Sequence, residues 1–460
     1  MNEDKNMLSK TYIGDRDFLR WVVRLGLPSM IQTLLACGVN ALNNILTGAH
    51  FGELEVSAVA QATTVFSIYD VLTYGFGGAC GILVAQYWGK RDRKSIRDIL
   101  SLTLRFELML GTLAAAVMTL FPTTVMSIMS NDPAVIELGS EFLRIAALNY
   151  FLYGIINAIY TTHNSIEMVQ VVFWGNILTY TVNLALSWVL IPSYGVRGAA
   201  FAAILARSVD FIYVVYMLLR NKSLEFKAKN VLQFNRNLLG DYLHTVYPIM
   251  GHEIIWSVGN NMSSILMGRL DTFAVSAYSI AQTLYSLHGA IPGGLGRAAS
   301  AIVGKCIGEG DKERAQKSAN TFVLLTAIVG LCMSASMFLL RPVFLSFYDL
   351  DPQVLEYANG LCMVMAVVMF FHGFDGVVLV STLRAGGMGK IGFYTDIIVM
   401  WMIGIPLGWF AISKGINPIW VVALVKVDMP LKSAVGVYFV LFRDWIHNLT
   451  RGEEPAAVAE

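Results

Sequence analysis

Long apolar segments recur along the whole chain and are separated by short polar stretches. Runs such as Leu108–Phe121 and Thr321–Leu340 contain no charged residue. A helix needs about 20 apolar residues to cross the hydrocarbon core of a bilayer. Such segments lie near 22–47, 56–84, 97–121, 136–160, 168–191, 197–219, 244–268, 274–302, 317–341, 355–383, 391–412 and 417–441. The pattern predicts an all-α polytopic membrane protein with twelve transmembrane helices.

The two halves of the chain resemble each other at an offset of 219–220 residues. The matched positions are Pro28 with Pro248, Gly48 with Gly268, Asp132-Pro133 with Asp351-Pro352, and Gly154 with Gly373. Six helices per half is an even number, so both halves enter the membrane the same way up, as in transporters with parallel repeats. The sequence therefore predicts two repeat-related six-helix bundles with a substrate path between them.

Lysine and arginine are distributed unevenly between the two ends of the predicted helices. Outside the spans, twenty-two basic residues fall on the side of the N-terminus and four on the other side. Because basic residues accumulate on the cytoplasmic side, both termini are expected to be cytoplasmic. The predicted organisation is a cytoplasmic segment 1–20, an N-lobe 21–220, a cytoplasmic linker 221–241, a C-lobe 242–442 and a cytoplasmic tail 443–460.

Composition supports a membrane protein and excludes several other classes. Hydrophobic residues make up 56% of the 460 positions and charged residues only 14%, against about a quarter charged in soluble domains. A net charge of +1 predicts no nucleic-acid partner. The five cysteines show no zinc spacing, and no Walker A sequence is present. The polar start is not expected to act as a cleavable signal peptide. No cofactor is expected.

Several short motifs together resemble the MATE (multidrug and toxic compound extrusion) family of transporters, of bacterial type. They are AQYWGKRD at 85–92, VGKCIGEGD at 303–311, LRAGG at 383–387, GVRGAAFA at 195–202, HEIIWSVG at 252–259 and the tail FRDWIHNLT. The resemblance covers nearly the whole chain. It implies two six-helix lobes and export of organic, often cationic compounds in exchange for inward Na⁺ or H⁺.

The resemblance also directs attention to three positions in the N-lobe. Many members have an acidic residue where this chain has Asn43, and some have an aspartate where it has Ser187. Asn43 and Asn183 could still coordinate a cation through carbonyl oxygens, or they could join helices by hydrogen bonds. The usual N-lobe carboxylates are absent, which leaves the part played by the N-lobe in coupling open.

Carboxylates inside the predicted spans are the main candidates for ion coupling, because charged groups at membrane depth usually face the protein interior or water. Glu253 lies nine residues past His244 and Asp375 nine residues before Arg384, so each is at a depth of about 13 Å from the cytoplasmic boundary. At equal depth they could share a proton or bind Na⁺, with structural hydrogen bonds or a salt bridge from Asp375 to Arg384 as alternatives. Asp70, near the middle of its span, could face a cavity or pair with Arg105.

Other charged residues in the spans favour structural roles. Arg207 with Asp210 and Lys426 with Asp428 occupy matching places in the two halves and are expected to form internal ion pairs. Asp396 lies close to the interface, where a structural hydrogen bond is expected.

The sequence thus predicts a secondary antiporter that exports small amphipathic, cationic compounds by rocking-type alternating access. It is expected to lie in the inner (plasma) membrane as a monomer, with membrane lipids and small-molecule substrates as its partners. A flippase for lipid-linked saccharides and a membrane-embedded enzyme are the alternatives. A flippase would need clustered Arg and Lys to bind phosphates, whereas the basic residues within the predicted spans are scattered. A membrane-embedded enzyme would need a cluster of catalytic residues, and the sequence contains none. The sequence distinguishes neither Na⁺ from H⁺ nor one exported compound from another.

Overall fold

The computed structural model describes residues 11–12, 15–232, 235–348 and 350–452, and these residues form helices and connecting turns without a strand. They divide into two compact units. The N-terminal unit comprises Ile31–Met250, and the C-terminal unit comprises the residues up to Met30 together with those from Gly251 onward. The division falls inside two long helices, so each of them contributes to both units. The lobe boundaries expected from the sequence stay a prediction.

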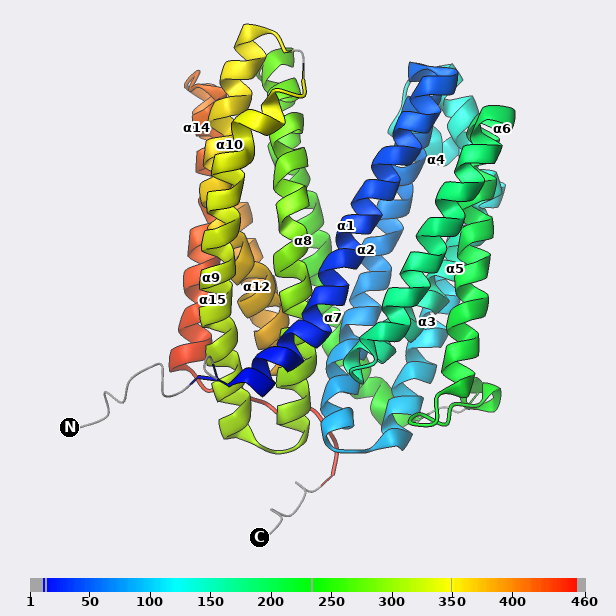
Figure 1. The fold of residues 1–460 in the computed structure, drawn as a ribbon, viewed down its shortest axis with the longest axis vertical. Coiled ribbons are helices and arrows are strands. Elements are labelled where there is room, and N and C mark those ends of the chain that lie inside the picture. Colours follow the sequence, from blue (N-terminus) through cyan, green and yellow to red (C-terminus); the bar gives the residue numbers. More distant parts are fainter. Residues whose placement is uncertain (1–10, 13–14, 233–234, 349, 453–460) are drawn as a thin grey trace, which may run out of the picture. The chain divides into compact units, whose positions relative to one another are not determined.

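The N-terminal unit is built from long helices (Figure 1). They are α1 (Arg16–Phe51, from Ile31), α2 (Glu53–Gly89), α3 (Arg93–Leu120), α4 (Pro122–Met129), α5 (Pro133–Ser165), α6 (Val169–Arg220), the short 3₁₀ helix η2 (Ala228–Leu232) and α7 (Arg236–Gly268, to Met250). Proline stands at the start of α4 and α5, where its missing N–H has no intrahelical partner to lose.

The 52 residues of α6 contain two of the predicted spans. The helix bends at Gly195, whose φ of 58° and ψ of −132° are not helical, and glycine adopts this conformation without a steric penalty. Just beyond the bend, a Cβ on Gly198 would lie 2.1 Å from the carbonyl oxygen of Leu190. The two glycines therefore allow the chain to reverse within very few residues.

The C-terminal unit contains the second set of helices (Figure 1). They are α8 (Thr272–Gly308), α9 (Lys312–Leu345), α10 (Pro352–Gly373), the π-helix η3 (Phe374–Thr382), α11 (Leu383–Ala385), α12 (Gly389–Thr395), the π-helix η4 (Asp396–Gly404), α13 (Ile405–Ser413), α14 (Pro418–Val425) and α15 (Asp428–Phe442). Read as continuous rods, α10 to α11, α12 to α13 and α14 to α15 each form one span. With the bend in α6, the described helices make the twelve predicted passes.

The internal repeat is visible in the turn after the second helix of each half. Asp92 accepts a hydrogen bond from the backbone N–H of Ser95, and Asp311 accepts one from that of Arg314. The residue before each aspartate has a positive φ, 61° at Arg91 and 82° at Gly310. Both turns thus end one helix and cap the next in the same way.

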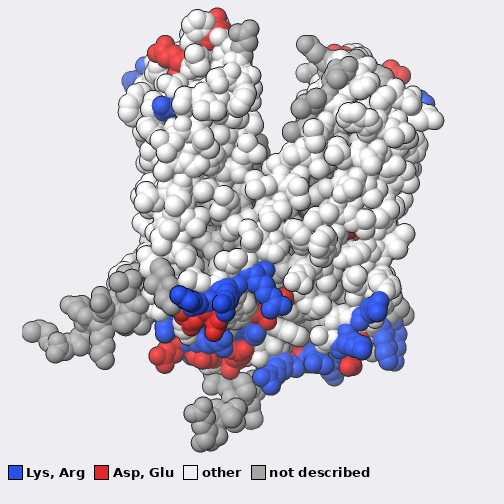
Figure 2. Space-filling view, in the orientation of Figure 1, with Lys and Arg blue, Asp and Glu red and all other residues white. Residues whose placement is uncertain are grey.

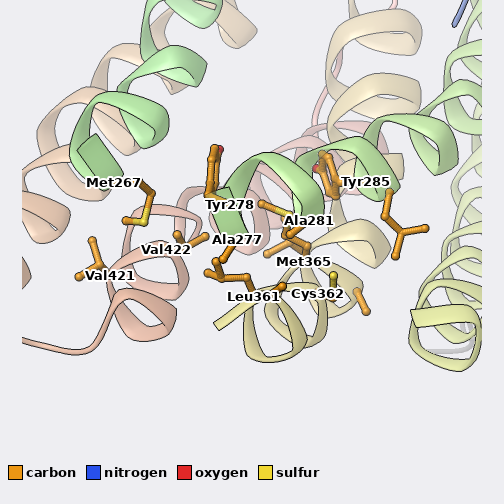
Figure 3. Close-up of a cluster of buried hydrophobic side chains, with 14 of the residues drawn as sticks. Met267, Ala277, Tyr278, Ala281, Tyr285, Leu361, Cys362, Met365, Val421 and Val422 are labelled. Atoms are coloured by element: carbon orange, nitrogen blue, oxygen red, sulfur yellow. The ribbon is translucent and has the colours of Figure 1, made fainter. Parts of the chain in front are cut away.

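Small and aliphatic side chains fill the interior of each unit. In the C-terminal unit, Ala277 and Ala281 on α8 pack against Leu361 and Met365 on α10 within one buried cluster (Figure 3). Eight of the described helical rods are long and apolar enough to cross a membrane by length and composition alone. The charged side chains on the visible face lie near the helix ends, and the middle of each unit is almost free of them (Figure 2).

Candidate functional site

A chain of buried charged side chains runs through the C-terminal unit and includes Glu253 on α7. Oε1 of Glu253 lies 2.8 Å from Nη2 of Arg384, and the same nitrogen lies 2.6 Å from Nδ1 of His252. The side chain of Glu253 is only 13% exposed. A guanidinium therefore neutralises this carboxylate within the helix bundle.

The chain continues from His252 to Asp396, Lys432 and Asp428. Nε2 of His252 lies 3.3 Å from Oδ2 of Asp396. Nζ of Lys432 lies 2.6 Å from Oδ1 of Asp396 and 3.1 Å from Oδ2 of Asp428. The side chains of Lys432 and Asp396 are both 0% exposed. Charges buried so completely persist where they are paired, so Lys432 is the resident counter-ion of two carboxylates.

Asp375 stands beside this chain, near the start of η3, and is 3% exposed. It interacts electrostatically with Lys432 and Lys426, and it repels Asp396. Its Oδ1 accepts no hydrogen bond from any described residue. A buried carboxyl oxygen without a donor is costly, so this position has the chemistry to accept a proton or a small cation.

The buried groups carry an imbalance of charge. We call these groups the C-terminal charge network. Its members are the carboxylates Glu253, Asp375, Asp396 and Asp428, the bases Arg384, Lys426 and Lys432, and His252. With a neutral imidazole, four carboxylates face three basic side chains. Uptake of one proton or one monovalent cation would balance them, and burial makes that balance energetically important.

Two of these carboxylates lie at π-helical turns. Asp375 is the second residue of η3, and Asp396 is the first residue of η4. The side-chain hydroxyls of Ser381 and Thr382 donate hydrogen bonds to the backbone carbonyl oxygens of Gly376 and Val377, respectively, five residues earlier. Wide turns of this kind are frequent at functional sites, because they turn side chains away from the regular helix face.

The N-terminal unit contains a cavity of about 440 Å³. Asn43 on α1 and Asn183 on α6 both line it, and Nδ2 of Asn43 donates a 2.8 Å hydrogen bond to Oδ1 of Asn183. Aromatic and hydroxyl side chains make up much of the remaining wall, among them Phe66, Phe142, Tyr150, Tyr180, Thr63, Thr64, Ser67, Thr179 and Ser187. The cavity wall thus combines apolar side chains with many polar groups, and polar groups set in an apolar wall can orient a bound small molecule.

Arg207 is the one charged residue among the described residues that line this cavity. Its guanidinium lies 3.5 Å from Oδ2 of Asp210 and donates a 3.1 Å hydrogen bond to Oδ1 of Asn149. Tyr160 also donates a hydrogen bond to Asp210. The positive charge of Arg207 is therefore neutralised from behind the cavity wall.

Asp70 lies one helical turn beyond the cavity-lining residues Phe66 and Ser67 of α2. Its carboxylate accepts a hydrogen bond from the hydroxyl of Tyr153 on α5. The guanidinium carbon of Arg207 lies 5.0 Å from the centre of the Tyr153 ring. Asp70 is thus connected to the cavity wall through one tyrosine.

Comparison with known proteins places the chain in a family. The sequence profile of the MatE family matches residues 28–189 and 248–410. This chain belongs to the MatE family. It is similar to the "Probable multidrug resistance protein NorM" of Agrobacterium fabrum (strain C58), with 25% identity over 422 residues that cover 86% of this chain and 88% of the relative. It is also 25% identical to the "Multidrug and toxin extrusion protein 1" of Homo sapiens, over 88% of this chain and 72% of the relative.

Solved structures of MatE transporters share the fold. A crystal structure of MATE in complex with MaL6 superposes with a TM-score of 0.84 at 17% identity, over 91% of this chain and 95% of that one. An outward-facing multidrug resistance MATE family transporter gives the same TM-score at 18% identity and covers 94% of its own chain. The predicted family and the twelve-helix, all-α membrane architecture are confirmed. As MatE members are transporters, this chain is a multi-pass membrane transporter and not an enzyme.

The structure distributes the predicted site residues over both units of this MatE protein. Asn43 and Asn183 meet at the cavity, with Asp70 beside it, whereas Glu253 and Asp375 belong to the C-terminal charge network. No hydrogen bond or ion pair joins Glu253 to Asp375 within the described chain; Glu253 pairs with Arg384. The roles in coupling and substrate binding stay predictions.

One of the two predicted repeat-related ion pairs is confirmed. Arg207 pairs with Asp210. Lys426 and Asp428 attract each other electrostatically but form no direct ion pair among the described residues, because Asp428 pairs with Lys432 at i+4 and Nζ of Lys426 donates a 3.1 Å hydrogen bond to Asn260. Residues four apart share a helix face, whereas residues two apart do not.

Two buried charged residues were not singled out from the sequence. Lys432 lies inside the predicted span 417–441, and Glu107 lies inside the span 97–121. The signal was present, since any ionisable residue at membrane depth needs a partner or a function. The i,i+4 spacing indicates Asp428 as one partner of Lys432, but the contact of Lys432 with Asp396 and the surroundings of Glu107 depend on helices far away in the sequence.

Proposed function

We propose that this MatE transporter is a secondary antiporter that exports small amphipathic, cationic compounds in exchange for inward H⁺ or Na⁺. The observation that carries the proposal is the C-terminal charge network, in which four buried carboxylates face three basic side chains. An excess buried charge of one sign is stabilised by binding a cation. That binding is then a source of free energy for shifting the transporter between its states.

The cavity of the N-terminal unit supports a role in substrate binding. Its volume of about 440 Å³ falls within the usual range for small-molecule pockets. The aromatic residues Phe66, Phe142, Tyr150 and Tyr180 line the cavity, and cations are attracted to the faces of aromatic rings. Arg207 is neutralised by Asp210, so it opposes a cationic substrate only weakly. The names of the relatives, which include multidrug resistance proteins, agree with this proposal.

The proposed location is the cytoplasmic membrane with both termini inside. The excess of lysine and arginine on the side of the N-terminus supports this orientation. We propose that a single chain is the transporting unit and that alternating access rocks its two repeat-related lobes, with no cofactor beyond the coupling ion.

A drug-susceptibility panel in an efflux-deficient bacterial host tests the export function. Strains carry the wild type, Glu253→Gln, Asp375→Asn, the control Glu356→Gln or an empty vector. Glu356 is an exposed acid on α10, so its neutralisation removes a charge without touching the buried network. The amount of each variant in the membrane is measured by immunoblot.

The proposal predicts that the wild type and Glu356→Gln raise the tolerated concentration of cationic dyes and antibiotics several-fold. Asp375→Asn loses this protection while it is still present in the membrane, because a neutral amide cannot recruit the coupling cation. Glu253→Gln also loses it, since the amide leaves Arg384 without its counter-ion. Equal susceptibility of the wild type and the empty vector across cationic, neutral and anionic compounds would reject multidrug export.

A further inference from the structure

The N-terminal unit contains a second buried acid, Glu107 on α3, which is 0% exposed. The side-chain amide of Asn157 lies close to it, but neither carboxyl oxygen makes a well-formed hydrogen bond to a described residue. Gly154 on α5 leaves the space that the carboxyl group occupies, because a Cβ at that position would lie 2.9 Å from Oε2 of Glu107. The carboxyl group therefore sits in a close-fitting niche between two helices.

Asp70 and Tyr69 of α2 lie next to this niche. A Cβ on Gly154 would also lie 3.1 Å from the hydroxyl oxygen of Tyr69. That hydroxyl donates a 2.6 Å hydrogen bond to the carbonyl oxygen of Tyr150. Asp70 is close enough to Glu107 to repel it electrostatically. The titratable and charged groups around Glu107 are Tyr69, Asp70 and Cys80 on α2, Tyr150 and Tyr153 on α5, Tyr242 on α7 and, beyond Tyr153, Arg207 on α6.

Among the described residues, no basic side chain interacts with Glu107 directly. An ionised carboxylate in such a place would have neither water, nor a counter-ion, nor a full set of donors, and buried charges of that kind become neutral by binding a proton. A second acid nearby strengthens the tendency, since two neighbouring carboxylates do not readily ionise together. We propose that Glu107 is a proton-binding site of the N-terminal unit, connected to the cavity by Asp70 and Tyr153.

The connection follows the contacts of Asp70. This residue is half-buried and follows the cavity-lining Phe66 and Ser67 by one turn of α2. It accepts the hydrogen bond of Tyr153, whose ring lies under Arg207 of the cavity wall. A proton from cavity water binds to the Asp70 carboxylate. It then passes to Glu107, which becomes neutral as Asp70 returns to its ionised form.

This site would provide the N-lobe with an acid that titrates, although it has Asn43 and Ser187 where the family resemblance implies a carboxylate in many and in some members, respectively. Its use in coupling rests on the proposed antiport, whereas proton binding itself does not. A measurement without substrate or gradient therefore separates the two. If proton binding is found and transport is not, the site stands and the antiport fails.

Infrared difference spectroscopy of the purified full-length protein in lipid tests the site, since a protonated carboxyl group has a carbonyl band separate from that of a carboxylate. The variants are Glu107→Gln, Glu107→Asp and the control Glu137→Gln, an exposed acid on α5. We expect the wild type and Glu137→Gln to show a buried protonated carboxyl band of Glu107 at neutral pH. Glu107→Gln loses this band, and Glu107→Asp keeps a band at a shifted frequency. An identical band in the wild type and both Glu107 variants would overturn the site.

Exchange of the carboxyl proton in deuterium oxide tests the connection to the cavity. We expect Asp70→Asn to slow the isotope shift of the Glu107 band by at least about tenfold, because a well-placed proton donor accelerates transfer by orders of magnitude. Glu137→Gln exchanges at the wild-type rate. Unchanged exchange in Asp70→Asn would refute the role of Asp70, and a role in packing alone would leave the exchange rate unaltered.

Discussion

Replacement of Lys432 by methionine tests how strongly the C-terminal charge network depends on its most deeply buried base. The ammonium group lies 2.6 Å from Asp396 and 3.1 Å from Asp428, and it is shielded from solvent. With an effective dielectric constant near 20, Coulomb's law gives attractions of about 6 and about 5 kcal/mol for these distances. The cost of removing the ions from water offsets most of that sum. Breaking a buried pair by removal of one partner costs about 3–5 kcal/mol net.

Thermal unfolding in detergent, followed by the loss of monodisperse protein, measures the effect. A loss of about 3–5 kcal/mol corresponds to a fall in Tm of roughly 10 °C for a unit of this size. Lys312→Met is the control, because Lys312 is exposed on α9 and changes at such positions alter stability by less than about 0.5 kcal/mol.

The double variant Lys432→Met with Asp396→Asn distinguishes an ion pair from simple loss of packing. Removing both partners leaves fewer uncompensated charges, so we expect its Tm to lie above that of Lys432→Met alone. A Tm for Lys432→Met within experimental error of the wild type would contradict a stabilising ion pair at Lys432. So would a double variant whose loss equals the sum of the two single losses.

Further predictions concern the repeat-related turns and the bend in α6, all measured as changes in thermal stability. Arg91→Gly raises stability by about 1 kcal/mol because it relieves a positive φ, whereas Gly310→Ala at the matching position lowers stability by about as much. A change of the same sign in both variants would contradict the matched geometry of the two turns. Asp311→Ala loses about 1 kcal/mol with its helix cap, and Asp311→Asn restores most of it. Gly198→Ala loses about 1–3 kcal/mol through its clash with Leu190, whereas Gly240→Ala, with no atom within 4 Å, is neutral or slightly stabilising.

The twelve spans were predictable because each one depends only on local hydropathy. In α6, the turn between the spans 168–191 and 197–219 is so tight that the two spans follow each other with a break only at Gly195. Even there, Pro192 and Gly195 marked the break in the sequence. The matched turns at Asp92 and Asp311 were likewise visible as a repeat, since the same residues cap both helices.

The partners of the buried charges were less predictable. The helical spacing of Asp428 and Lys432 could have been used, but the pairing of Lys432 with Asp396 joins α15 to η4, and that of Arg384 with Glu253 joins α11 to α7. Such contacts depend on how helices pack, which hydropathy does not encode. The π-helical turns at Asp375 and Asp396 are equally hidden, because one extra residue in a helical turn leaves no compositional mark.

Efflux from proteoliposomes under imposed gradients shows whether a cation gradient drives export by this transporter. Protein is reconstituted with a fluorescent cationic dye, and either a pH gradient or a Na⁺ gradient is applied while the membrane potential is clamped. We expect one of the two gradients to accelerate dye movement against the concentration gradient of the dye, and we expect Asp375→Asn to abolish the acceleration. Dye movement that proceeds at the same rate with and without both gradients would contradict cation-coupled export.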